Sequence, residues 1–178
     1  MVRRRGRLLG FGVVLASLVA HFNCAPTVQT DEQDIAPTAG GIELANRFSG
    51  QWRMLALRMG TCPPAKILNP FQGQVDISTD EHRIFVDALD LPGVRIRLSA
   101  ANESDFIHRS VVTVSECRFV EDHRLELQSL TETTARGKYR WALSWNTEPD
   151  CTELVRQYSS GLDTPCEMII DFEGTRRE

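Results

Sequence analysis

The sequence predicts an all-β fold, an eight-stranded antiparallel up-and-down meander barrel, with at most one short helix between residues 147 and 165. Two observations support this. From Glu43 onward, short segments of alternating apolar and polar residues recur, with turn residues between them, which is the pattern of an all-β chain. Eight such segments joined by short connections favour closure into a barrel, because closure leaves no exposed strand edge. The 178 residues suffice for one domain with a real core.

Each predicted strand is defined by its alternation. Val94, Ile96 and Leu98 alternate with polar residues, which indicates one buried and one solvated face. Tyr139 begins a similar run, and Phe172 belongs to the last one. The predicted strands are residues 51–60, 71–78, 83–88, 94–99, 106–117, 124–130, 138–146 and 166–174.

Residues 1–24 have the form of an export signal. Four arginines precede an apolar run from Leu8 to Ala20, and Cys24 follows it closely. The segment resembles a bacterial lipoprotein signal, although His21, Phe22 and Asn23 depart from the usual residues before the cysteine. The resemblance implies acylation of Cys24, with the protein on the periplasmic or cell-surface face of the bacterial outer membrane. Without acylation, we expect a secreted protein.

The remainder divides into a linker and a barrel domain. Residues 25–42 are rich in Pro, Thr, Asp, Gln and Gly and predict a flexible linker, and residues 43–178 form the predicted barrel. Loss of residues 1–24 removes four arginines and no acidic residue, so the net charge falls from −4 to −8. An acidic domain with scattered bases argues against a nucleic-acid partner.

Four cysteines remain after the signal segment, an even number that favours two disulfides in an exported protein. Their spacing leaves three pairings open. In a meander all four fall at one end of the barrel, the mouth, which satisfies the short Cα–Cα distance that a disulfide needs. The cysteines are Cys62, Cys117, Cys151 and Cys166.

The run Phe48-Ser49-Gly50-Gln51-Trp52-Arg53, within residues 43–55, resembles the lipocalin signature. The resemblance implies that Gly50 allows a tight turn and that Trp52 plugs the barrel floor. It also implies that an arginine near the end of the last strand packs across this indole, and Arg176, on the parity of Phe172, is the matching position. No room remains for the helix that usually follows the last lipocalin strand.

The lipocalin resemblance further implies a small hydrophobic ligand held inside the barrel. The alternative is a core filled by the protein's own side chains, because eight strands enclose little space. The predicted ligand-binding residues are the larger side chains expected inside: Trp141, Trp145, Tyr139, Phe85 and Met54.

No motif predicts catalysis, so we expect no enzyme, no cofactor and no metal site. In the predicted meander His82, His108 and His123 lie apart and do not converge. Asp105, His108 and Ser110 are the residue types of a catalytic Ser-His-Asp triad. We interpret them instead as part of a polar outer face.

Two other function classes stay open. Gly50, Trp52 and the cysteine ten residues later also resemble small bacterial barrel inhibitors of secreted metalloproteases, in which an extended N-terminal trunk enters the protease cleft. Residues 25–42 are the matching segment. The third possibility is a structural envelope lipoprotein with a filled core and an unknown protein partner.

Overall fold

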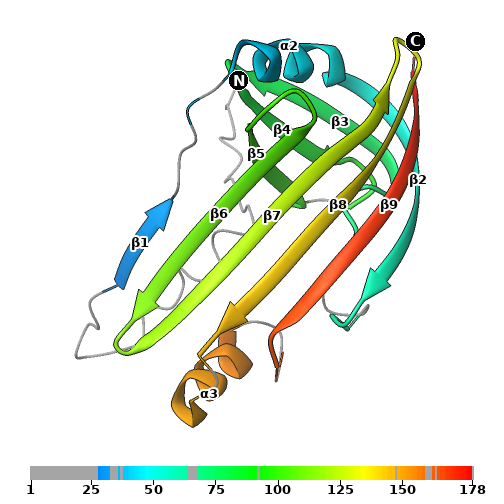
Figure 1. Cartoon of the computed structure of the whole chain (residues 1–178). Helices are drawn as coiled ribbons and strands as arrows, with labels where there is room; N and C mark the ends of the chain where they lie inside the picture. The colour runs from blue at the N-terminus through cyan, green and yellow to red at the C-terminus, as the bar shows by residue number, and fades with distance from the viewer. Residues whose placement is uncertain are drawn as a thin grey trace, which may run out of the picture.

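The structure is a computed structural model that describes residues 28–32, 36, 38–63, 68–91, 93–146, 148–158, 162 and 164–177. The predicted signal segment and Cys24 lie outside these residues. Two helices, α2 (Ala39–Phe48) and α3 (Pro149–Tyr158), accompany one long sheet (Figure 1). Neither helix, nor any other in the described ranges, is long and apolar enough to cross a membrane. The strands are β1 (Val28–Glu32), β2 (Gly50–Gly60), β3 (Gly73–Asp80), β4 (Arg83–Ala88), β5 (Arg95–Ala100), β6 (Asp105–Val114), β7 (Cys117–Leu130), β8 (Thr134–Trp145) and β9 (Cys166–Arg176).

Strands β2 to β9 form a closed antiparallel barrel, which confirms the predicted fold class. Each strand pairs with the next along the chain, and β9 pairs with β2 from Trp52↔Arg176 to Gly60↔Met168, which closes the cylinder. The contact between β5 and β6 is short, limited to the pairs Ser99↔Ile107 and Ala100↔Phe106. Beside it, β1 adds to the edge of β6 with the register Val28↔Val114 to Glu32↔Ser110.

The end of the barrel at α2 is sealed. Thr38 caps the helix by accepting a hydrogen bond from the Gly41 N–H, at 3.1 Å. The indole of Trp52 is fully buried and donates to the Phe48 carbonyl at 2.9 Å. Arg176 Cζ lies 4.6 Å from the centroid of this ring, the contact expected from the parity of the last strand. Gly50 has a φ of 127°, which glycine adopts without strain, and its position lies beside the Arg176 guanidinium.

The opposite end, at α3, carries both disulfides. Cys62 pairs with Cys166 and Cys117 with Cys151, with Cα–Cα distances of 4.9 and 5.3 Å. All four cysteines therefore lie at one end, as the meander predicts. The second bridge ties α3 to the start of β7, and α3 falls within the range in which one short helix was expected.

Three features differ from the sequence-based expectation. β6 and β7 are joined by the two-residue turn Ser115-Glu116, so Cys117 begins a strand rather than ending one. Ser115 has a φ of 55° without the Asn-Gly or Asp-Gly pair that usually marks such a turn. In addition, β1 and the start of α2 fall within residues 25–42, which were expected to form a linker. The described side chains of β1 are exposed, so backbone pairing with β6 orders this strand without an apolar pattern.

Candidate functional site

The interior-facing side of β8 carries most of the predicted ligand-binding residues. Tyr139, Trp141 and Trp145 are buried and alternate with exposed or half-buried residues. Met54 is also fully buried, but it packs beside Gly174, in the half of the barrel nearer to α2. The structure therefore separates Met54 from the three aromatic residues of β8.

The structure corrects the prediction that Phe85 binds a ligand inside the barrel. Phe85 alternates with the buried Ile84 and Val86 and so belongs to the outer face of β4. The Arg95 guanidinium lies over its ring at 4.5 Å. A phenylalanine within a strand was assumed to face inward, but the parity of its neighbours and this cation–π contact place it outside.

A polar cluster surrounds Trp141 inside the barrel. The Trp141 indole N–H donates to Glu121 Oε1 at 2.7 Å, and His123 Nε2 lies 3.2 Å from the same oxygen. His123 Nδ1 and the Tyr139 hydroxyl are 2.7 Å apart. With a proton on Nε2, His123 donates to Glu121 and accepts from Tyr139, so the three hydrogen bonds form one chain.

His108 joins this cluster from β6, contrary to both expectations for the histidines. His108 and His123 are direct partners in the β6–β7 register, and their ring centroids are 5.6 Å apart. His108 shares the parity of the buried Phe106 and Val112, so it faces inward and is not part of a polar outer face. In the part of the chain that the structure describes, no group of three or more His, Cys, Asp or Glu side chains has an arrangement that could hold a metal ion.

Burial and the neighbouring charges shift three pKa values in this cluster. Burial would raise the pKa of the Glu121 carboxyl, but the hydrogen bond and charge of His123 and the hydrogen bond from Trp141 hold it below its ordinary value. Burial, and then the Glu121 charge, raise the pKa of the Tyr139 hydroxyl well above 10. Burial and the proximity of His123 lower the pKa of His108. Glu121 is therefore ionised and Tyr139 neutral at neutral pH.

A small cavity of about 20 Å³ lies against the cluster. Its lining combines polar groups from His123, Tyr139 and Trp141 with the apolar side chains of Leu68, Pro70, Val94, Ile96 and Met168. This volume accommodates about one water molecule. Beside Tyr139, the buried ring of Phe71 lies 4.7 Å from the Phe172 centroid and 5.0 Å from that of Tyr139.

One buried donor near the α3 end has no acceptor. The Trp145 indole N–H makes no hydrogen bond, although the side chain is buried. Trp145 pairs with Phe119 at the end of β8, two inward-facing positions beyond Trp141. It is therefore available to an acceptor that enters from this end.

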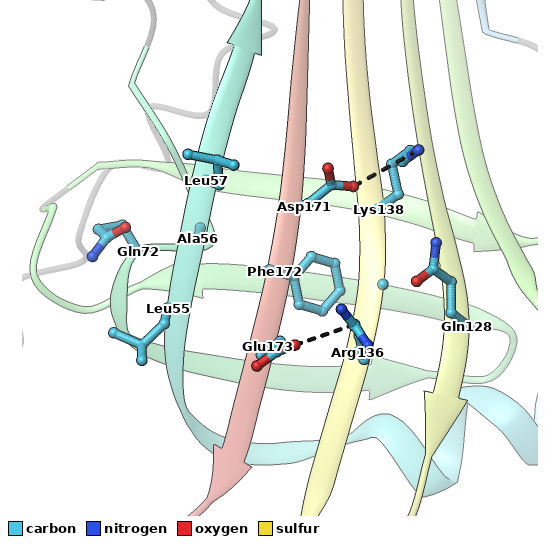
Figure 2. Close-up of a pocket in the computed structure, with 11 residues that line it drawn as sticks. Leu55, Ala56, Leu57, Gln72, Gln128, Arg136, Lys138, Asp171, Phe172 and Glu173 are labelled. Carbon is cyan, nitrogen blue, oxygen red and sulfur yellow. Dashed lines mark ion pairs between the residues drawn. The ribbon is translucent and has the colours of Figure 1, made fainter.

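The outer surface carries a second candidate site, which sequence reasoning missed. An open groove lies across β2, β9, β8 and β7, and Figure 2 shows the residues that line it. Its volume is about 700 Å³. Leu55 and Leu57 form its apolar wall and are 69% and 66% exposed. The opposite side contains two surface ion pairs, Arg136–Glu173 at 3.2 Å and Lys138–Asp171 at 3.8 Å. Two exposed leucines at alternate positions of one strand were the available signal.

The fold and these contacts define the chain as a closed eight-stranded antiparallel barrel with a polar cluster in its interior. The chain matches no protein-family model, and no curated protein or solved structure is significantly similar to it. Function must therefore be argued from the cluster, the cavity and the groove themselves.

Proposed function

We propose that the chain is an exported, lipid-anchored, lipocalin-like protein that binds a small, largely hydrophobic molecule in the α3 half of its barrel. The observation that supports this proposal most directly is the mixed lining of the cavity, in which five apolar side chains accompany three members of the hydrogen-bonded cluster. Concave sites with mainly apolar walls and a few convergent polar groups are typical of small-molecule binding. The proposed lipid anchor is an acyl group on Cys24, as the sequence of residues 1–24 predicts.

Binding in this site requires local rearrangement. The cavity holds about one water molecule, so a larger ligand takes the place of apolar lining such as Leu68 and Pro70. The ligand gains about 25 cal/mol for each Å² of its apolar surface removed from water, less the cost of ordering. We therefore expect ligands of modest size and moderate affinity.

Tryptophan fluorescence tests the proposal, because Trp141 lines the cavity. The protein is titrated with fatty acids, retinoids and haem-like compounds, and its thermal stability is followed in parallel. Ile96→Phe adds volume to the cavity wall and should weaken binding. Ile107 is the control position, because it has the opposite parity to the buried Phe106 on β6. Ile107→Phe should leave binding unaltered. If no ligand changes either fluorescence or stability, the proposed function is wrong.

The outer groove favours a second candidate function, a protein-binding barrel. Leu55 and Leu57 are the most exposed large apolar residues among those described, and Met59 continues the same row on β2. Exposed apolar patches rimmed by charged residues mark protein interaction sites. A double change of Leu55 and Leu57 to serine should then abolish cross-linking of the protein to its partner in envelope preparations, whereas it should leave ligand-induced fluorescence unaltered.

The inhibitor-like version of this second function has a separate test. Its trunk would include β1, whose backbone is paired with β6 in the structure. Deletion of residues 25–37, which keeps the Thr38 cap and α2, should abolish inhibition of co-secreted proteases if the trunk acts, and should leave a small-ligand binder unaffected.

A further inference from the structure

The interior carboxylate of Glu121 is only partly satisfied. Both of its donors, Trp141 and His123, reach the same oxygen, Oε1. Within the described residues no hydrogen bond reaches Oε2, and the Glu121 side chain is 14% exposed to solvent. An oxygen of a carboxylate in the barrel interior is thus open to a donor that enters from the α3 end.

Apart from His108 and from His123, whose bond to Oε1 favours the ionised carboxylate, no basic side chain of β6, β7 or β8 faces the interior around Glu121. On β6, β7 and β8 the Arg and Lys residues all occupy outward-facing positions, where Arg109 pairs with Asp122 and Arg140 with Glu167. Of the two arginines with inward parity on β2 and β9, Arg176 stacks on Trp52 and Arg58 donates to the Cys62 carbonyl. The lowered pKa of His108 favours its neutral form. An ionised group away from water is costly unless a counter-charge compensates it.

The walls of the cavity suit the rest of an amphipathic cation. Trp141 presents an aromatic ring beside the carboxylate, and aromatic faces attract ammonium groups. Val94, Ile96 and Met168, the last of them the cross-strand partner of Trp141, offer apolar contact in the same cavity. A positively charged head and an apolar body are therefore matched by adjoining parts of one site.

The geometry points to an aliphatic amine as the ligand class, with its ammonium group donating to Glu121 Oε2 and its hydrocarbon chain against Val94, Ile96 and Met168. This inference rests on the proposed function, because the hydrocarbon chain lies in the same cavity. Glu121 does not itself line that cavity but contacts Trp141 and His123, which do. The inference goes beyond the proposed function in predicting selectivity, namely that the site discriminates ligands by the charge of the head group.

Three ligands with the same chain test the selectivity: octylamine, 1-octanol and octanoate. They are titrated against the full chain at about pH 8, where a free imidazole with a pKa of ~6.5 is neutral and an alkylamine is charged. Binding is followed by tryptophan fluorescence and calorimetry. We expect octylamine to bind about tenfold more tightly than 1-octanol and octanoate to bind most weakly. Equal affinities, or the tightest binding by octanoate, would overturn the inference while leaving the proposed function intact.

Matched variants separate the site from the general attraction of an acidic protein for cations. Glu121→Gln keeps the shape of the side chain and should remove the preference for octylamine. Glu126→Gln removes an exposed carboxylate on the opposite parity of the same strand and should keep it. A preference that survives in E121Q, or disappears in E126Q, contradicts the inference. Should E121Q not fold, the wild-type ranking with E126Q still decides, and failure of all three ligands to bind refutes both the inference and the proposed function.

Discussion

His108 and His123 face each other across the β6–β7 pair inside the barrel, with ring centroids 5.6 Å apart. Protonation of both would bring two positive charges together in a poorly solvated place. This contact makes acid sensitivity an expected property of the fold.

The pH dependence has a defined sign. The pKa of His108 is lower in the folded protein than in the unfolded chain, because burial and His123 disfavour the charged form. The unfolded state therefore takes up protons first, and stability should fall as the pH drops from about 6.5 through the folded-state pKa. Urea unfolding at intervals across this window should show a smaller slope for His108→Gln than for the wild type.

Two controls isolate the effect of His108. Glu121 also loses stabilisation in acid, but its carboxyl pKa is lowered in the folded protein, so that loss occurs below the ordinary glutamate pKa of about 4.3. His82→Gln changes a histidine at the β3–β4 turn and should keep the wild-type slope. Parallel slopes for wild type and His108→Gln would contradict the prediction.

The stacking of Arg176 on Trp52 should be measurable as stability. Arg176→Ala removes the cation–π contact and the hydrogen bond to the Arg47 carbonyl, and we expect a loss of about 1–2 kcal/mol. Arg176→Lys should retain part of this energy. Thermal unfolding measures both variants. A wild-type melting temperature for Arg176→Ala would show that the contact is energetically neutral.

The orphan donor of Trp145 predicts an unusually tolerant core position. Trp145→Phe loses apolar contact but also removes a buried N–H that has no acceptor, whose burial costs about 1–3 kcal/mol. The net change in unfolding free energy should therefore be small. Trp141→Phe, which breaks the bond to Glu121, should cost clearly more. The opposite order would mean that Trp145 has an acceptor in solution.

The two disulfides should contribute unequally. Cys62–Cys166 closes a loop with a sequence separation of 104, and Cys117–Cys151 one of 34. In the chain-entropy description the longer loop is worth roughly 1 kcal/mol more. Paired Cys→Ser variants, compared by denaturant unfolding, should rank in this order. The reverse order would indicate that strain or unfolded-state structure dominates.

Much of the barrel was predictable because its signals are local. Alternation identified the inward parity of β8 and β9, and counting strand reversals placed all four cysteines at one end. The same parity put Arg176 over Trp52. The parity and the position of the cysteines depend only on the two-residue period of a strand and on the direction of each segment. The contact of Arg176 with Trp52 also required the resemblance to the lipocalin signature.

The polar cluster was not predicted, because its members are polar residues at inward-facing positions of a strand. Residues 118–123 of β7 were left between two predicted strands, because the polar Glu121 and His123 interrupt the apolar inward positions and the Ser115-Glu116 turn lacked a glycine signal. Shifting the hairpin to its true place brings His108 opposite His123. A few residues of error in one turn thus hid the site.

By itself, the sequence determined the eight strands of the barrel, the parity of its core and the shared end of the cysteines, since these follow from alternation and from the direction of successive strands. The contact of Arg176 with Trp52 followed from the same parity together with the lipocalin resemblance. Only the tertiary structure decided the disulfide pairing, the outward position of Phe85 and the union of Glu121, His123, His108, Tyr139 and Trp141. These depend on cross-strand register and on which side chains satisfy one another when buried, and neither is written in the order of residues along a single strand.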